Sequence, residues 1–213
     1  MTSTTEPDAG GRKVFVVGLS KTGTSTMKVM LGRLGYNVCG PRKHLLKAWR
    51  DGNFSAVDDT LEAFDAFEDW PWPLVYRTAS ERYGDRARFI LTHRSSADAW
   101  FRSIESHGYG TRALRSMKDA YGHYRPFGRK QAFVQQYNDH NDAVRAYFAG
   151  QPHRFTDFCL ENGDGWQKLC AFLDHPVPED DVPHRNRSVP GRKRLNRAYN
   201  TLIAPIYRRW PHG

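Results

Sequence analysis

"VFVVGLSKTGTSTMKVML" stands at residues 14–31 and decides the fold. Four apolar residues lead to Gly18, a loop of small and hydroxyl residues follows, and from Thr24 or Ser25 onward apolar residues recur at helical spacing. The stretch therefore predicts a buried strand, a tight turn and a helix. This arrangement points backbone N–H groups and the positive end of the helix at one spot, where a phosphate is stabilised.

The position of its lysine separates this loop from the common nucleoside-triphosphate loop, which reads G-x-x-x-x-G-K-[ST]. Gly18 and Gly23 have that spacing, and Ser25 stands at the hydroxyl position. Thr24, however, stands where the lysine is expected, and the lysine comes earlier, as Lys21. We therefore expect a phosphate compound to be bound with a lysine on the loop itself rather than at the start of the helix.

Strand-like and helix-like segments alternate along the rest of the chain. Further strands are expected at YNVC (36–39), DAFED (65–69), ARFILTHR (87–94) and HRFTDFCL (153–160). Alternation of this kind predicts a three-layer α/β domain, with a parallel sheet flanked by helices on both faces.

Local signals predict where some helices begin. Ser95 or Ser96 is expected to cap the helix after the strand 87–94. The prolines of WPWP (70–73) are expected to stop regular structure before a helix that starts at Leu74. In the basic tail 183–213 the second half is expected to be helical, whereas segment 108–128 has no clear pattern.

Composition limits the classes of protein to consider. The chain has 213 residues, 39% of them hydrophobic, and a mean hydropathy of −0.72. It has neither an apolar run of about 18 residues nor a secretory signal pattern, so we expect a cytoplasmic protein. Cys39, Cys159 and Cys170 are expected to be buried thiols rather than disulfides or zinc ligands. The net charge of +9 indicates anionic partners.

Two phosphate-binding stretches together resemble those of sulfotransferases. The run GLSKTGTSTM (18–27) resembles their 5′-phosphosulfate loop P-K-[ST]-G-T-[TS], with Ser20 in place of the proline. The run ARFILTHRSSADAWFRS (87–103) resembles their 3′-phosphate motif, in which a strand ends in arginine and a serine follows in the next helix. A third stretch, GDGWQKLCAFLDHPVPEDDVPHRN (163–186), resembles the C-terminal segment of bacterial sulfotransferase-like proteins.

The resemblance implies a P-loop-type sheet and transfer of a sulfuryl group from 3′-phosphoadenosine-5′-phosphosulfate (PAPS), which leaves adenosine 3′,5′-bisphosphate. It implies no requirement for a metal. Lys21 would bind the 5′-phosphate and steady the leaving oxygen, while Arg94 and Ser103 would bind the 3′-phosphate. Two alternatives stay open: Ser95 or Ser96 shares the task of Ser103, or Arg94 forms a surface salt bridge instead. Arg185 or Arg187 would close over the 3′-phosphate. The remaining implied contacts to the 5′-phosphate come from Thr22, Gly23, Thr24, Ser25 and Thr26.

The acceptor needs a general base. Related animal enzymes use a histidine in a Lys-x-His-x-Pro stretch, and the corresponding FEDWPWP (67–73) has Asp69 where that histidine would stand. Asp69 is our first choice for the base and Glu68 the second. Two other readings of Asp69 stay open, a helix cap and a partner for an arginine. His140 and Asn141 are read as a polar helix face or as acceptor contacts.

The predicted organisation has three parts: a disordered tail (1–12), a sulfotransferase domain (13–187) and a basic C-terminal extension (188–213). An apolar stripe with basic flanks in the extension is expected to pack on the domain or on a second subunit of a homodimer. As an alternative, 192–209 contacts a membrane surface.

Other functions stay open at this point. A nucleotide-dependent kinase is disfavoured by Thr24 at the lysine position and by the lack of a clear aspartate at a strand end to hold magnesium. A non-catalytic module that binds nucleotide or nucleic acid would use the positive charge, but no nucleic-acid partner is expected. The acceptor is not identified, and a small molecule, a glycan or a lipid all fit, with transfer to oxygen or to nitrogen.

Overall fold

The computed structural model describes residues 12–111, 115–183 and 190–209, and within them five strands form one parallel sheet. The strand order is β2-β3-β1-β4-β5, with β1 paired to β3 and β4. The strands are β1 (Lys13–Val16), β2 (Val38–Cys39), β3 (Ala66–Glu68), β4 (Ala87–Thr92) and β5 (Phe155–Phe158). The predicted parallel α/β sheet is confirmed, and the carboxyl ends of its strands meet at one edge.

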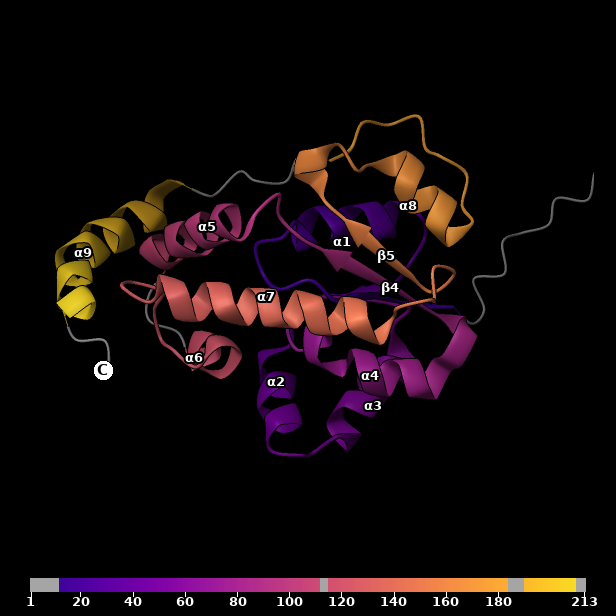
Figure 1. The fold of residues 1–213 in the computed structure, drawn as a ribbon, viewed down its shortest axis with the longest axis horizontal. Coiled ribbons are helices and arrows are strands. Elements are labelled where there is room, and N and C mark those ends of the chain that lie inside the picture. The colour runs from indigo at the N-terminus through magenta and orange to yellow at the C-terminus, as the bar shows by residue number, and fades with distance from the viewer. Residues whose placement is uncertain (1–11, 112–114, 184–189, 210–213) are drawn as a thin grey trace, which may run out of the picture.

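Helices cover both faces of this sheet (Figure 1). The helices are α1 (Thr24–Arg33), α2 (Lys43–Arg50), α3 (Ser55–Ala63), α4 (Trp72–Tyr83), α5 (Ala97–Gly110), α6 (Arg115–Tyr121), α7 (Lys130–Tyr147), α8 (Trp166–Leu173) and α9 (Pro190–Arg209). Short 3-10 turns, η1 (Gly84–Arg86) and η2 (Leu160–Asn162), precede β4 and follow β5.

Alternate residues of each strand enter two different apolar layers, as the period of two in a strand requires. Val14 and Val16 of β1 face α1 and α8, where Met30 and Leu169 are fully buried. Phe15 faces the opposite side of the sheet, where it stacks between aromatic neighbours in a cluster with residues of α4 and α7. In Figure 1, α1 and α8 lie above the sheet, α4 lies below it and α7 runs across the front.

A third apolar cluster joins α5, α6 and α7 to the loop that follows β1. Trp100 of α5 stacks on Tyr137 of α7 with ring centroids 4.5 Å apart, and Leu19 of the loop belongs to the same cluster. The Trp100 indole also donates a hydrogen bond of 2.9 Å to the Ser20 carbonyl. The cluster therefore holds the loop against the helices beside it.

Several element boundaries differ from the expectation. Helix α4 begins at Trp72, not at Leu74, with Pro71 as N-cap and Pro73 in its first turn. The prolines do not stop this helix because the first turn needs no N–H donor. Ser96 caps α5 as predicted, since its hydroxyl accepts a hydrogen bond of 3.1 Å from the Ala99 amide.

The C-terminal helix α9 lies against α5 and is longer than expected, since it begins at Pro190. The buried Asn200 side chain donates hydrogen bonds to the carbonyl oxygens of Gly108, Tyr109 and Thr111 at 2.7–3.1 Å. Asn196 and Arg125 also donate to carbonyl oxygens of residues 108–111, so together with Asn200 they hold the end of α5.

Two further expectations can be compared with the structure. The three cysteines are free and buried, as predicted. Over the residues described, the model contains no helix that is long and apolar enough to cross a membrane.

Candidate functional site

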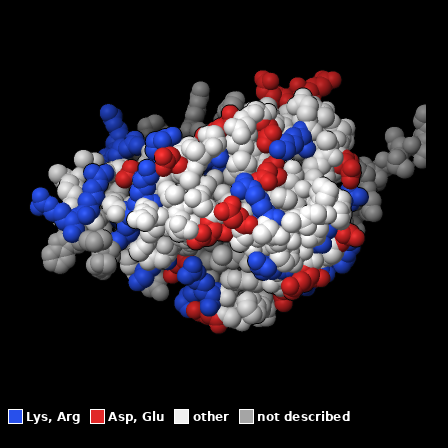
Figure 2. Space-filling model, in the orientation of Figure 1, with Lys and Arg blue, Asp and Glu red and all other residues white. Residues whose placement is uncertain are grey.

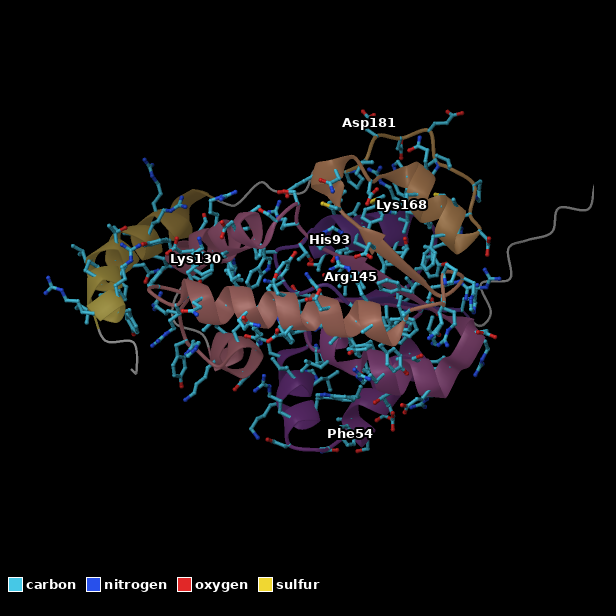
Figure 3. All side chains as sticks on the ribbon, viewed as in Figure 1. Phe54, His93, Lys130, Arg145, Lys168 and Asp181 are labelled. Atoms are coloured by element: carbon cyan, nitrogen blue, oxygen red, sulfur yellow. The ribbon has the colours of Figure 1, made fainter. Side chains whose placement is uncertain are left out.

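A cavity of about 570 Å³ lies at the carboxyl edge of the sheet. Its floor is the loop 20–26, and residues that follow β3, β4 and β5 form its walls. Figure 3 labels one of these, His93, at the end of β4. The other lining residues outside the loop are Asp69, Arg94, His107, Leu160, Glu161, Gly163, Asp164, Val182 and Pro183.

Two glycines allow the loop to approach its neighbours. A Cβ at Gly18 would lie 2.0 Å from the Thr92 carbonyl oxygen of β4, and a Cβ at Gly23 would lie 2.7 Å from the Leu160 side chain. Gly23 also has φ of +106°, in the left-handed region that favours glycine. The close approach of β4 thus requires glycine at position 18, and that of η2 requires glycine at position 23.

The start of α1 is open to an anion. Its N-cap, Gly23, makes no side-chain capping bond, and no acidic residue stands in the first turn. The amides of Thr26 and Met27 bond to the Gly23 carbonyl, whereas those of Thr24 and Ser25 come too early in the helix for an intrahelical acceptor. This end of α1 therefore has the donors and the dipole that a phosphate requires.

Not every hydroxyl of the loop serves the cavity. The Thr22 hydroxyl is buried, donates to the Leu19 carbonyl at 2.6 Å and lies 2.7 Å from the Thr92 hydroxyl. The Thr24 side chain bonds to Glu68. These two hydroxyls hold the loop in place, so the predicted contacts of Thr22 and Thr24 with a phosphate are left to their backbone amides.

The arginine and the serine predicted for the 3′-phosphate lie together beside this loop. Arg94 Nη2 donates a hydrogen bond of 3.2 Å to the Ser103 hydroxyl, and Arg94 Nε donates one of 2.8 Å to the Lys21 carbonyl. Arg94 lines the same cavity as the loop 20–26, and its guanidinium joins Ser103 of α5 to the backbone of Lys21.

Glu161, on η2, also contacts this arginine, and the sequence analysis did not find it. Its carboxylate binds Arg94 Nη1 and accepts hydrogen bonds from the Ser95 amide at 2.8 Å and the Ser95 hydroxyl at 2.6 Å. Burial alone would raise the pKa of Glu161, but the bonds from Ser95 and the charge of Arg94 hold it below its usual value. In the sequence, the only sign that Glu161 belongs to the site was its position just after a strand of the predicted parallel sheet.

Asp69 lies on the opposite side of the loop and lines the cavity. Its Oδ1 accepts hydrogen bonds from the Ser20 hydroxyl at 2.5 Å and from the Trp70 amide at 2.9 Å. Burial raises the pKa of this carboxyl, against the lowering effect of these bonds. The alternative role as a helix cap belongs to the backbone of Asp69. Its carbonyl oxygen, not its side chain, accepts a hydrogen bond from the Trp72 amide at the start of α4.

Glu68, the second choice for the base, lies beneath the loop and not on the cavity. It is 3% exposed and next to Lys28 and Thr24 of α1. Burial, with the nearby Asp69 charge, raises its pKa to about 7. Glu68 is the last residue of β3 and Asp69 follows it directly. The expectation that no clear aspartate stands at a strand end was therefore wrong.

Other predicted residues do not reach the cavity or cannot be placed. His140 Nε2 donates a hydrogen bond of 2.7 Å to the Val17 carbonyl and so supports the residue after β1. Asn141 is buried, and neither residue lines the cavity. Arg185 and Arg187 lie outside the residues that the structure describes. Within the described part of the chain, no cluster of three or more histidine, cysteine or acidic side chains could hold a metal ion.

Comparison with known proteins agrees with this geometry. A family model described as "Sulfotransferase domain" matches residues 13–189. One relative, "Ava biosynthesis cluster protein M" from Aspergillus versicolor, is 27% identical in an alignment that covers 81% of this chain and 80% of that protein.

Proposed function

This chain belongs to the sulfotransferase domain family, and we propose that it transfers a sulfuryl group from PAPS to a hydroxyl or amine of an acceptor. One observation carries the proposal. The Arg94 guanidinium lines the same cavity as the loop 20–26 and bonds to the Lys21 carbonyl and to the Ser103 hydroxyl, which supports two separate anion-binding groups in one cavity. A nucleotide with phosphates on both sides of its ribose needs two such groups.

The residues present fit PAPS. The uncapped start of α1 suits the 5′-phosphate, and the planar guanidinium of Arg94 suits a dianionic 3′-phosphate through paired hydrogen bonds. A cavity of about 570 Å³ is in the range of small-molecule sites. PAPS, when bound, supplies the activated sulfuryl group.

Lys21 and the α1 amides would then stabilise charge where it develops. The bond from sulfur to the 5′-phosphate oxygen breaks as the bond from the acceptor to sulfur forms, and adenosine 3′,5′-bisphosphate leaves. Lys21, with the amides of residues 22–26, would bind that phosphate and neutralise the charge of its leaving oxygen. Arg94 and Ser103 would fix the other end of the nucleotide and so align the displacement.

Asp69 would take the proton of the acceptor. The hydrogen bonds from Ser20 and Trp70 hold Oδ1, and Oδ2 would be the oxygen that accepts that proton. Its raised pKa makes it a stronger base than an exposed aspartate once it is ionised. The Ser20 hydroxyl and the Trp70 amide would orient the carboxylate. For the acceptor itself, we propose a small molecule, a glycan or a lipid.

A second candidate function, a nucleotide-dependent kinase, is favoured by the same carboxylates. P-loop kinases hold magnesium with an aspartate at a strand end beside the loop, and Asp69 follows β3 and contacts Ser20 of the loop. Against this, Thr24 stands where such enzymes place the lysine. We therefore rank the kinase below the sulfotransferase.

A thermal-shift titration with adenosine 3′,5′-bisphosphate, beside ATP with magnesium, tests the proposal. At a hundredfold excess over Kd, a ligand stabilises the native state by about 2.7 kcal/mol. We expect the bisphosphate to raise Tm by several degrees and ATP with magnesium to have little effect. A larger shift with ATP and magnesium would instead support the kinase, and no shift with the bisphosphate would refute the sulfotransferase.

A further inference from the structure

The Glu161 carboxylate lies where a second anion would meet Arg94. Its two oxygens take hydrogen bonds from the Arg94 guanidinium, the Ser95 amide and the Ser95 hydroxyl. These three donors belong to the segment that joins β4 to α5, and Arg94 also bonds to Ser103. The same three kinds of donor, an amide, a hydroxyl and a guanidinium, also suit a phosphate.

We propose that Glu161 occupies the 3′-phosphate position of the donor site and that a donor nucleotide binds by displacing it. This inference rests on the proposed function, because it needs a 3′-phosphate that competes for Arg94. It makes Glu161 a specificity-determining residue. A nucleotide that lacks a 3′-phosphate leaves the carboxylate in place, whereas one that carries it brings two charges against one and takes over the same donors.

Displacement of Glu161 needs little rearrangement. Its side chain is 34% exposed and stands on η2, a short turn that ends at Gly163 with φ of +88°. An ion pair so exposed is weak, so the loss of its bonds is readily offset by those of a phosphate dianion. The carboxylate would then move into solvent.

Isothermal titration calorimetry with two nucleotides tests this role. Adenosine 3′,5′-bisphosphate carries the competing phosphate, and adenosine 5′-monophosphate lacks it. We expect Glu161→Gln to tighten bisphosphate binding about fivefold and to leave monophosphate binding unchanged, with Glu161→Ala acting in the same direction. Glu105→Gln serves as the control, because it removes the same charge from a residue that does not line the cavity.

The outcomes separate this inference from the proposed function. If the wild type binds the bisphosphate but both Glu161 variants bind it equally well or more weakly, Glu161 does not compete with the phosphate and the inference is wrong. An equal gain for both nucleotides would show a general charge effect and would also overturn it. If the wild type does not bind the bisphosphate, the proposed function fails, and the inference fails with it.

A different observation concerns the outer face of α9. Its apolar side chains Leu195, Tyr199, Leu202 and Ile206 are 77%, 59%, 77% and 61% exposed, and they recur at helical spacing. The opposite face packs on α5 through Asn200 and Ala204. Arg194 and Arg209 stand on the same helix, whereas Arg197 and Arg208 bond to Ser106, Tyr109 and Glu105 of α5. Figure 2 shows Lys and Arg side chains gathered over this end of the molecule.

We infer that this face of α9, defined by Leu195, Tyr199, Leu202 and Ile206, lies on an anionic lipid surface. Apolar side chains flanked by arginines are the pattern of a helix that lies in the plane of a membrane interface. A second copy of the chain fits less well. The face is a single stripe of four side chains, whereas a stable interface buries about 800 Å² per partner.

Co-sedimentation with vesicles tests the inference. We expect the wild type to pellet with vesicles of phosphatidylglycerol and phosphatidylcholine and to stay in solution with phosphatidylcholine alone. The double variant Leu195→Ser, Leu202→Ser should lose this binding, whereas Phe54→Ser, which removes an exposed apolar side chain of the loop before α3, should keep it. A wild type that stays in solution with anionic vesicles would overturn the inference, as would a dimer in ultracentrifugation that the double variant dissociates.

Discussion

Arg94 Nε donates a hydrogen bond of 2.8 Å to the carbonyl oxygen of Lys21, although the two residues are 73 positions apart in the chain. The same guanidinium reaches Ser103. The loop after β1 and the segment after β4 are thereby joined at one point. In our proposal, this point lies between the two phosphates of the donor and fixes the distance between their binding groups.

The shape of Arg94, not only its charge, should matter for donor binding. Arg94→Lys keeps the charge but cannot bond at once to the Lys21 carbonyl, to Ser103 and to an anion. We expect its Kd for adenosine 3′,5′-bisphosphate to rise about tenfold or more, as for the loss of a charged hydrogen bond. Calorimetry measures this change. Arg82→Lys, which alters ion pairs with Asp58 and Glu62 away from the cavity, should have no such effect, and equal losses in both variants would argue against the assignment.

Asp69→Asn should separate chemistry from binding. We expect kcat to fall by about 10²–10⁴ and the Kd for the bisphosphate to stay near the wild-type value, because Asp69 is not among the proposed phosphate ligands. In the wild type the rate should rise with pH as the carboxyl ionises through its raised pKa, and the variant should lose this limb. A pH profile with an acceptor, once one is found, measures both. A normal kcat in Asp69→Asn beside a large loss in Glu68→Gln would move the base to Glu68.

Glu68 should make stability depend on pH. Burial raises its pKa from 4.5 to about 7 in the folded protein, so its contribution to stability is fully present below about pH 4.5 and is lost as pH rises through 7. Glu68→Gln stays neutral at every pH. Its free energy of unfolding, relative to that of the wild type, should therefore rise between about pH 4.5 and 7, by up to about 3 kcal/mol.

Urea unfolding at pH 5 and pH 8 measures this gain. Asp98→Asn is the control: hydrogen bonding to Lys130 lowers the pKa of that exposed carboxyl, so it is ionised at both pH values and its difference from the wild type should not change between them. A gain for Glu68→Gln that shrinks as pH rises would contradict the burial argument.

Gly18 should not tolerate a side chain. In Gly18→Ala the new Cβ would lie 2.0 Å from a backbone oxygen of β4, and we expect a loss of about 3 kcal/mol in unfolding free energy together with weaker bisphosphate binding. Gly32→Ala, in the exposed part of α1, meets nothing within 4 Å and should gain about 0.5–1 kcal/mol. Chemical denaturation compares the two, and similar stabilities would show that β1 and β4 can separate.

Much of the fold was predictable because local patterns and global packing agree. The run from Val14 to Leu31 specified strand, loop and helix by itself, and the alternation of strands and helices specified the parallel sheet. The helix start at Trp72 was missed because proline was read as a stop, although it is tolerated in a first turn. The segment 108–128 was unreadable because α6 is short and its apolar residues pack on α5 and α7.

The site was predictable only where motifs exist. Arg94 and Ser103 were found by the resemblance of residues 87–103 to the 3′-phosphate motif of sulfotransferases, and the structure brings them into contact. Glu161 belongs to no motif, and its contact with Arg94 depends on β5 lying next to β4, which a single sequence does not reveal. For the same reason, the bond between Ser20 and Asp69 follows from the pairing of β1 with β3.

A crystal structure of the protein with adenosine 3′,5′-bisphosphate tests the central claim most directly. The account predicts the 5′-phosphate on the amides of residues 22–26 beside Lys21, the 3′-phosphate on Arg94 and Ser103, and Glu161 moved away from Arg94. A nucleotide in the reverse orientation, or one bound outside this cavity, would contradict the account.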